Sequence, residues 1–139
     1  MRAPLRVTLL LGSAMALAAC APIGRVADGD TIVAGASHYR LWAIEAPDLR
    51  QVCADGWPAG LEAKRALETM IRDRRVVCEN RGHDPYRRAL ALCRVDGEDL
   101  GGAMVAAGMA WASSPPDYLG IEHDAEDKRL GLHAHQCSR

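Results

Sequence analysis

The fold is decided by residues 28–48, which read DGDTIVAGASHYRLWAIEAPD. Two apolar segments, Thr31–Ala34 and His38–Ile44, flank a Gly-Ala-Ser sequence whose small residues suit a tight chain reversal. A third short apolar segment, Ile23–Val26, precedes the Asp-Gly-Asp turn. The three segments together predict a meander of three consecutive strands.

The clearest helix follows a loop-like stretch, Leu49–Gly60, which glycine and proline interrupt repeatedly. Ala63, Leu67, Met70 and Ile71 lie at positions i, i+4, i+7 and i+8, so they form one apolar stripe along a helix. Charged residues surround this stripe and predict a solvent-exposed opposite face.

Two further strands are predicted at Arg75–Glu79 and Ala89–Val95, with a polar connection between them. Asp99 is expected to cap a second helix that continues to Met109. Asp117 is expected to start a third helix. The residues expected to face inward from that helix are Ile121, Ala125 and Leu130.

The predicted order is three strands, a helix, two strands and two helices. This order matches the OB-fold, a partly open five-stranded barrel that commonly binds oligonucleotides. The expected class is therefore α+β dominated by β, with three helices. Strands and helices do not alternate, which excludes a doubly wound parallel sheet. Because a fold does not determine a function, the site residues must supply that argument.

The first nineteen residues are typical of a signal peptide, with Arg2 and Arg6 before the apolar run Val7–Leu17. The run is too short for a transmembrane helix, which needs about 20 apolar residues. Leu-Ala-Ala-Cys, ending at Cys20, resembles the lipobox of bacterial lipoproteins, in which the cysteine is lipidated. The alternative is ordinary secretion, with cleavage after Ala18 or Ala19.

The remaining residues, 20–139, have a length suited to one domain, which we expect to be monomeric. They carry 15 basic and 18 acidic residues, a formal charge of −3. A polyanion must therefore be bound by a local group of cations. We expect the protein to be exported to the periplasm or cell surface and anchored to the membrane through Cys20.

Four cysteines follow Cys20, and an even number in an exported chain predicts two disulfides. Cys78 and Cys93 end two apolar runs that are expected to pair as a hairpin, so we predict a bond between them. Cys53 would then join a loop to the C-terminal tail at Cys137. Zinc binding is the alternative, but the Cys-x-x-Cys spacing of common zinc sites is absent.

Three clusters contain residues suited to phosphate chemistry. Asp28–Thr31 places two carboxylates beside a glycine, and hard cations prefer such oxygen ligands, although Asp-Gly is also a common turn. Arg40–Asp48 brackets an apolar strand with one arginine and two acids, as a salt-bridged surface strand also would. Asp84–Arg88 contains adjacent arginines, which bind phosphate oxygens; the alternative is a solvated basic loop.

Taken together and in this order, the clusters resemble the staphylococcal nuclease (thermonuclease) family. That family shows Asp-Gly-Asp-Thr, then Arg-Leu-x-x-Ile/Val-Asp-x-Pro-Glu, then Asp-x-Tyr-Gly-Arg. Gly108-Met109-Ala110 and the segment from Ala125 to Leu132 match later family patterns, with His133 in place of a tryptophan. The resemblance covers nearly all of the chain after residue 20. It implies a calcium-dependent endonuclease that hydrolyses DNA and RNA.

The resemblance also implies a role for each matching position. The calcium ligands are expected to be Asp30, Glu45 and the backbone carbonyl of Ala46, with Asp28 beside the ion. Two arginines, Arg40 and Arg88, are expected to bind the scissile phosphate and stabilise its developing charge. Asp48 matches the glutamate that positions or deprotonates the attacking water.

Two departures from the family pattern fall on the expected site. Glu45 is one methylene longer than the family's aspartate, and Asp48 is one methylene shorter than its glutamate. A misplacement of this size can cost about a hundredfold in rate. Two hypotheses therefore remain, a working endonuclease and a catalytically impaired OB-fold binding module. In addition, Arg87 replaces the family's glycine, which either strains the turn or adds a phosphate contact.

Overall fold

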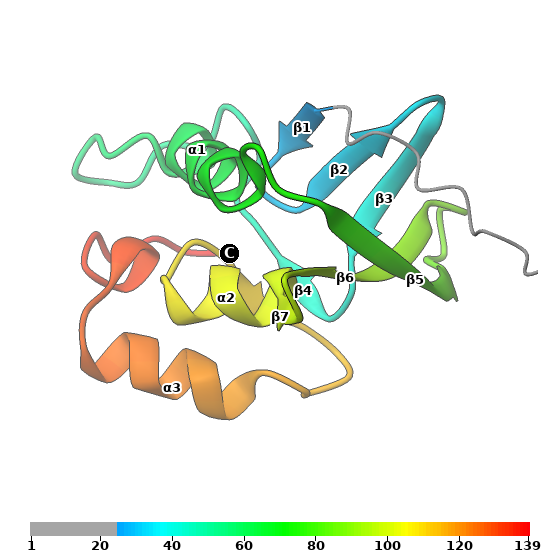
Figure 1. Ribbon diagram of the computed structural model, residues 1–139. Coiled ribbons are helices and arrows are strands. Elements are labelled where there is room, and N and C mark those ends of the chain that lie inside the picture. The colour runs from blue at the N-terminus through cyan, green and yellow to red at the C-terminus, as the bar shows by residue number, and fades with distance from the viewer. Residues whose placement is uncertain (1–24) are drawn as a thin grey trace, which may run out of the picture.

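The structure is a computed structural model that describes residues 25–139. Its main sheet contains five strands of four to eight residues: β1 (Arg25–Asp28), β2 (Thr31–Ala34), β3 (Ser37–Leu41), β5 (Val76–His83) and β6 (Ala89–Val95). They are ordered β1-β2-β3-β6-β5, and a two-residue strand, β7 (Glu98–Asp99), pairs with β6. The five main strands, the three helices and the strand-rich α+β class agree with the predicted OB-type fold (Figure 1).

One strand pair is parallel in a sheet whose other pairs are antiparallel. β1, β2 and β3 form the predicted antiparallel meander, and β5 pairs antiparallel with β6. β3 and β6 are parallel, with Arg40 opposite Leu90 in the register. This pairing places the end of β3 beside the beginning of β6. The loop that precedes β6 is therefore brought next to Arg40.

The expected strand His38–Ile44 is wrong in its second half. β3 ends at Leu41, because Ala43 adopts a left-handed backbone with a φ of 59°. The chain turns and then forms β4 (Ile44–Glu45), which pairs with β8 (Trp111–Ala112) in a separate two-stranded sheet. Residues on either side of this turn therefore do not share the alternating faces of one strand.

The three helices are α1 (Ala59–Ile71), α2 (Leu100–Ala106) and α3 (Leu119–Asp127). α1 packs against β1 and α2, α2 packs against β6, and α3 packs against α2 and β8. The predicted stripe of α1 is confirmed, since Ala63, Leu67 and Ile71 are buried and Met70 is partly buried against the same core. Asp99 caps α2 as predicted, with its side chain accepting a hydrogen bond from the backbone of Gly101. α2 ends before Met109, because Gly108 turns the chain at a φ of 67°.

The third helix differs from its prediction in its start and its inner face. It begins at Leu119, and the Asp117 carboxylate accepts a hydrogen bond from the indole of Trp42 at 2.9 Å. Ala125 is buried as expected, whereas Ile121 and Leu130 are both 36% exposed. Glu122 is buried in their place and pairs with Arg139 at 3.0 Å, so the inner face of α3 includes a charged contact with the C-terminal segment.

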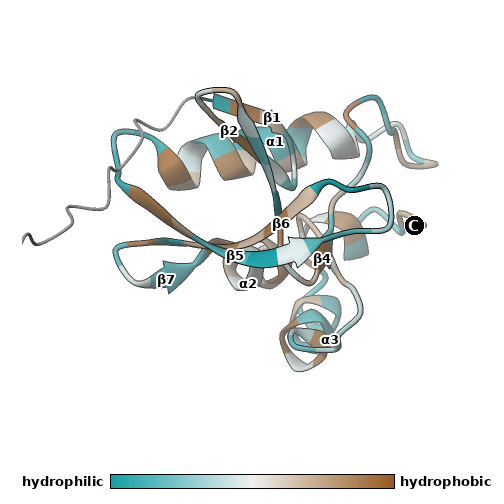
Figure 2. Cartoon of the chain, turned by 90° about the vertical axis from the view of Figure 1, so that its right-hand side faces the viewer, coloured by the Kyte–Doolittle hydropathy of each residue, from teal (hydrophilic) through white to brown (hydrophobic). Residues whose placement is uncertain are grey.

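The main core lies between the sheet, α1 and α2. Its largest fully buried members include Leu41, Leu67, Val95 and Met104. Figure 2 shows hydrophobic and hydrophilic bands alternating along α1, and β5 changing from hydrophobic at its start to hydrophilic at its end. The end of β5 therefore extends away from the core and carries a polar loop into solvent.

A smaller core joins the loop before α1 to the C-terminal segment, which includes a short 3-10 helix, η1 (Gly131–His133). It consists of Cys53, Ala59, Trp111 and Leu132. Both disulfides have the connectivity expected from the sequence, Cys53 with Cys137 and Cys78 with Cys93. Disulfides of this kind are typical of extracellular or periplasmic proteins.

Within residues 25–139, no helix is both long enough and apolar enough to cross a membrane. The predicted signal peptide and Cys20 lie outside the described residues.

Candidate active site

The turn between β1 and β2 carries Asp30 into a buried position. Gly29 permits this geometry, because a Cβ atom there would lie 2.6 Å from the Cβ of Ala63 and 2.7 Å from that of Ala46. α1 and the segment after β4 therefore both pack against the turn. Asp30 is only 2% exposed, so its carboxylate depends on protein partners rather than water.

Three groups bind the Asp30 carboxylate. The Arg40 guanidinium contacts both oxygens, at 3.1 and 2.9 Å. The Thr31 hydroxyl donates a hydrogen bond to one oxygen at 3.0 Å, and the backbone N–H of Ala46 donates to the other at 3.1 Å. These contacts connect the β1–β2 turn, β3 and the segment after β4, which the sequence separates.

Burial governs the protonation of Asp30. It raises the pKa of this carboxyl to about 6, although the positive charge of Arg40 and the Ala46 hydrogen bond act in the opposite direction. The neighbouring negative charge of Asp28 contributes to the increase. A buried carboxylate with a raised pKa gains stability from any additional cation placed beside it.

The loop between β5 and β6 is organised around Asp84. Its carboxylate accepts hydrogen bonds from the backbone N–H groups of Tyr86 and Arg88, at 2.9 and 2.8 Å, and from the Arg88 side chain at 2.5 Å. Desolvation disfavours the charged form of Asp84, but these hydrogen bonds outweigh it and lower its pKa. The centre of the Tyr86 ring lies 5.5 Å from the Arg88 guanidinium, which adds a cation–π contact to the bond with Asp84.

Arg40 and Arg88 line one open cavity of about 340 Å³. Glu45 lies in the same wall, so the structure brings together three residues assigned from the sequence. Side chains 48 residues apart thus face a common space because β3 and β6 are paired in parallel. Its size and two guanidinium groups suit a phosphate with part of an attached nucleotide.

Sequence reasoning missed three polar residues of this cavity. His83, Ser113 and Ser114 also line it. The sequence offered one signal for His83, which is its position directly before the Asp84–Arg88 motif. The two serines had none, because they reach the cavity only through tertiary structure: β8 pairs with β4, and the N–H of Ser113 donates to the carbonyl of Ala43.

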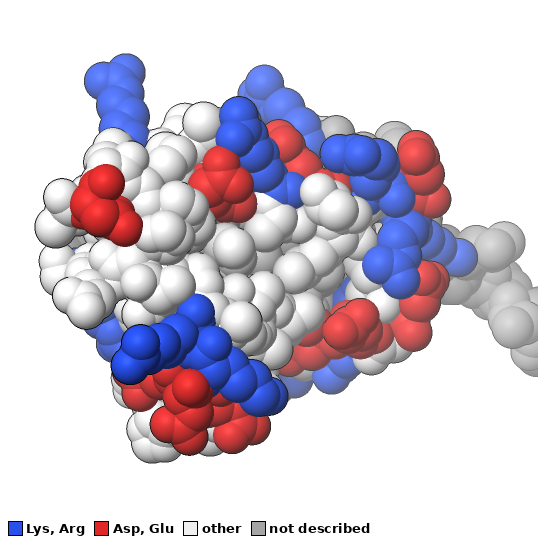
Figure 3. Space-filling model, turned by 90° about the vertical axis from the view of Figure 1, so that its left-hand side faces the viewer, with Lys and Arg blue, Asp and Glu red and all other residues white. Residues whose placement is uncertain are grey.

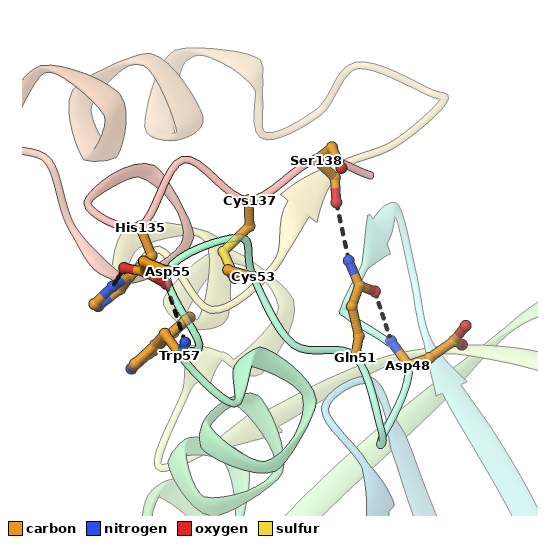
Figure 4. The surroundings of a disulfide bond; sticks show 8 residues. All are labelled: Asp48, Gln51, Cys53, Asp55, Trp57, His135, Cys137 and Ser138. Atoms are coloured by element: carbon orange, nitrogen blue, oxygen red, sulfur yellow. Dashed lines mark hydrogen bonds and ion pairs between the residues drawn. A yellow bond between two sulfur atoms is a disulfide. The ribbon is translucent and has the colours of Figure 1, made fainter.

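Asp48 is placed differently from the other predicted residues. It is exposed, and it is not among the residues that line the cavity. Its backbone N–H donates to the Gln51 side chain at 3.2 Å, and Gln51 donates to the carbonyl of Ser138 at 2.9 Å. In Figure 4 the carboxylate of Asp48 points away from Gln51. Asp48 therefore lies outside the wall of the cavity that the two arginines line.

The Asp48 segment is attached to the C-terminal tail at several points beside the Cys53–Cys137 disulfide (Figure 4). His135 stacks on Trp57, with ring centroids 4.3 Å apart, and its ring nitrogen lies 2.6 Å from the Asp55 carboxylate. The hydrogen bond with His135 lowers the pKa of Asp55. The position of Asp48 thus depends on a loop held by distant residues.

The expected calcium ligands are only partly assembled. Among residues 25–139, no three acidic, histidine or cysteine side chains form a metal site. The expected set needs only two carboxylates and one carbonyl, and the Ala46 N–H contact places the Glu45–Ala46 segment beside Asp30. Oxygen donors of this kind match the preference of calcium. The donor atoms therefore fit calcium. The Arg40 guanidinium, however, already contacts both carboxylate oxygens of Asp30.

Surface charge is mixed away from this cavity. Figure 3 shows the face that carries the loop before α1, where acidic and basic side chains alternate around a broad uncharged area. This face offers no extended field of positive charge. Compared with this face, the arginines at the cavity are the better candidates for binding a polyanion.

Comparison with known proteins adds independent evidence. Residues 38–135 match the family model described as staphylococcal nuclease homologue. A Haemophilus influenzae protein named uncharacterized endonuclease is 30% identical over 119 residues, which cover 79% of this chain and 64% of that protein. Protein ParB of Escherichia coli is 33% identical over 127 residues, 78% of this chain and 68% of that protein.

The succinoglycan biosynthesis protein ExoI of Rhizobium meliloti is 30% identical over 120 residues, 82% of this chain and 58% of that protein. This chain therefore spans between 58% and 68% of the length of these relatives.

Proposed function

This chain belongs to the staphylococcal nuclease homologue family, and from that premise we propose that it is a calcium-dependent endonuclease hydrolysing phosphodiester bonds in DNA and RNA. The observation that carries the proposal is the shared cavity of Arg40 and Arg88, with Glu45 in its wall. Two guanidinium groups from separate segments converge there on a space suited to a phosphate.

Arg40 and Arg88 bind the scissile phosphate in this proposal. Each guanidinium donates hydrogen bonds to phosphate oxygens and remains charged at any relevant pH. Their carboxylate partners, Asp30 and Asp84, fix the orientation of the guanidinium groups before the substrate arrives. Such preorganised charge stabilises the extra negative charge of the transition state without reorganisation during the reaction.

Asp30, Glu45 and the carbonyl of Ala46 would hold the calcium ion. When bound, the ion supplies positive charge beside the phosphate. The raised pKa of Asp30 supports this assignment, because a cation would offset the cost of keeping that buried carboxylate ionised. Asp28, in the same turn, adds negative charge near the proposed ion.

Asp48 is proposed to accept a proton from the attacking water. The water oxygen forms a bond to phosphorus, the bond from phosphorus to the leaving oxygen breaks, and the water proton passes to the carboxylate. Asp48 must approach the cavity for this step, because it does not line it in the structure. Apo structures often leave catalytic groups away from their reacting positions.

A nuclease assay on the purified chain with a calcium titration tests this proposal. We expect hydrolysis of DNA and RNA that depends on calcium and is abolished by a chelator. Arg88→Ala should reduce kcat by roughly a hundredfold or more. A folded protein without hydrolysis above background would refute the enzymatic function.

The exposed position of Asp48 and the exchanged acid lengths favour one second candidate, a binding module with an impaired site. The double variant Glu45→Asp/Asp48→Glu distinguishes the two. A large rise in activity would identify a damaged site, whereas a fall would show that catalysis is adapted to the present lengths.

We further propose that the protein is exported and anchored through a lipidated Cys20. The signal-like sequence and the two disulfides support export. Metabolic labelling with a fatty-acid analogue tests the anchor, and we expect label on the wild type but not on Cys20→Ser. Equal labelling of the two proteins would contradict it.

A further inference from the structure

A second cavity, of about 680 Å³, adjoins the candidate active site. The two cavities share three wall residues, Arg40, His83 and Arg88. Other residues that line the second cavity include Thr31, His38, Tyr39, Asn80 and Arg87. It therefore borders the place where the scissile phosphate is proposed to bind, on the side formed by β2, β3 and the end of β5.

Arg87 differs from the two arginines that the cavities share. Arg40 is paired with Asp30, and Arg88 with Asp84. The Arg87 side chain is exposed and makes no hydrogen bond or ion pair within the part of the chain that the structure describes. Its five N–H donors are therefore available to an external acceptor.

The backbone of Arg87 is held in a conformation that favours glycine. Its φ is 64°, and its N–H donates to the carbonyl of Asp84 at 2.9 Å, so the Asp84 loop fixes this geometry. A side chain in the left-handed region costs free energy that glycine would avoid. Arginine therefore occupies this position at a cost in free energy, beside a cavity where its side chain can bind an anion.

We propose that the second cavity binds the phosphodiester next to the scissile one, and that Arg87 is its phosphate-binding residue. This inference rests on the proposed nuclease function. A nucleic-acid strand places its phosphates one nucleotide apart, so a strand held by Arg40 and Arg88 extends into neighbouring space. A guanidinium binds such a phosphate through two parallel hydrogen bonds. His38 and Asn80 add further polar groups to the same wall.

The charged residues that line the second cavity are consistent with a phosphate ligand. Of the residues that line the second cavity, three are arginines and Asp28 is the acid. Arg40 and Arg88 already have carboxylate partners, so Arg87 is the arginine of this wall without one among the described residues. A single added phosphate contact predicts a measurable salt effect, since each contact releases bound counterions from the nucleic acid.

Arg87→Gly is the informative variant, because glycine suits the local backbone and the protein is expected to fold. Arg129→Gly is the matched control: Arg129 is exposed, has a φ of 51°, and its side chain has no partner within residues 25–139. Both variants lose one positive charge at a left-handed position. Thermal melting should show both folded.

Binding of a single-stranded phosphorothioate oligonucleotide in chelator gives a readout that does not require turnover. For Arg87→Gly we expect the slope of log K against log salt to become shallower by about 0.7, the value for one contact on a single strand. The KM for an oligonucleotide should rise about tenfold, and far less for a nucleotide 4-nitrophenyl ester that has one phosphodiester. Arg129→Gly should match the wild type, and Arg87→Lys should retain most of the slope.

Two results would overturn the proposal in distinguishable ways. If the wild type binds and cleaves nucleic acid while Arg87→Gly and Arg129→Gly behave alike, the subsite is wrong and the nuclease function stands. If the wild type neither binds nor cleaves nucleic acid, the proposed function fails and the subsite fails with it.

Discussion

The guanidinium of Arg40 contacts both carboxylate oxygens of Asp30, and this pair joins the β1–β2 turn to the last residues of β3. Asp30 is buried, while the Arg40 side chain keeps 21% of its surface exposed at the cavity. One residue of the pair therefore faces the protein interior and the other faces the proposed substrate.

Replacement of Arg40 should affect both stability and activity. In Arg40→Ala the buried Asp30 carboxylate loses its charged partner, and the free energy of unfolding should fall by roughly 3 kcal/mol, the lower end expected for a broken buried pair. Activity should fall at least a hundredfold. Urea unfolding and nuclease assays at pH 7 measure the two effects.

Arg88→Ala is the matched control for the stability effect. The Arg88 side chain is 52% exposed and that of Asp84 is 11% exposed, and Asp84 keeps two backbone N–H donors when the Arg88 side chain is removed. This partly exposed pair should therefore contribute about 1 kcal/mol. Activity should fall as in Arg40→Ala, but stability should change little. Equal destabilisation by the two variants would show that the Asp30–Arg40 pair has no special structural role.

The raised pKa of Asp30 predicts how stability depends on pH. The pKa of Asp30 is about 6 in the folded protein, against its ordinary value of 3.8 in the unfolded chain. Between pH 3.8 and about pH 6, the folded protein therefore binds a proton at Asp30 more tightly than the unfolded chain does. The contribution of Asp30 to stability is therefore fully present below pH 3.8 and is lost as the pH rises through about 6. The loss should be roughly 3 kcal/mol for a shift of this size.

Urea unfolding in chelator from pH 4 to pH 7 measures this contribution. The unfolding free energy of the wild type minus that of Asp30→Asn should decrease as the pH rises. Only the wild type titrates at this position, because asparagine has no ionisable group. A difference that is constant across the range would contradict the assignment of this titration to Asp30.

The two disulfides should differ in their effects. Cys53 and Cys137 are 84 residues apart, and Cys78 and Cys93 are 15 apart. Loop-closure entropy predicts that Cys53→Ser/Cys137→Ser lowers the free energy of unfolding by about 4.5 kcal/mol, and Cys78→Ser/Cys93→Ser by about 3 kcal/mol. Chemical denaturation of the two double variants provides the comparison.

Activity separates the same two variants. Loss of the Cys53–Cys137 bond removes one attachment of the tail to which Gln51 binds and so loosens the Asp48 segment. We expect kcat to fall about tenfold with little change in KM, measured where both variants remain folded. Loss of Cys78–Cys93 should leave kcat within about twofold. Identical kcat values would argue against a link between the tail and Asp48.

Two glycines decide how the C-terminal segment meets the end of α2. A Cβ atom at Gly131 would lie 2.4 Å from the carbonyl oxygen of Gly108, and the N–H of Leu132 donates to that same oxygen. Gly131→Ala should therefore cost more than the roughly 1 kcal/mol of a strained backbone alone. We expect about 3 kcal/mol, comparable to other overpacked sites.

Gly35→Ala is the control for this prediction. Gly35 also has a positive φ, 59°, but no atom lies within 4 Å of a Cβ built there. Only the backbone strain remains, so its cost should be about 1 kcal/mol. Thermal or urea unfolding of both variants measures the difference, and equal costs would show that the close approach to Gly108 is easily relieved.

The sequence by itself determined the features that depend on local pattern. The period of Ala63, Leu67 and Ile71 specified the buried face of α1, and apolar runs ending in Cys78 and Cys93 specified a hairpin with a disulfide. Asp99 was recognisable as a helix cap. The ordered motifs also indicated the family, because each motif is contiguous in the chain.

Only the tertiary structure decided how these pieces meet. The parallel pairing of β3 and β6 brings Arg40 to Arg88, and the β4–β8 pair brings the two serines of residues 113–114 to the same cavity. The left-handed turn at Ala43 redirects a chain that local pattern continued as one strand. Likewise, the buried carboxylate of Glu122 has its charged partner in Arg139, at the far end of the chain.

The position of Asp48 shows the same limit at the site itself. A contiguous motif identified it, but Gln51 and the tail at Ser138 decide where its segment lies. Strand pairing, ion pairs and contacts with the tail depend on residues far apart in the chain. Periodicity and motif spacing report only on neighbours, so they cannot specify such contacts.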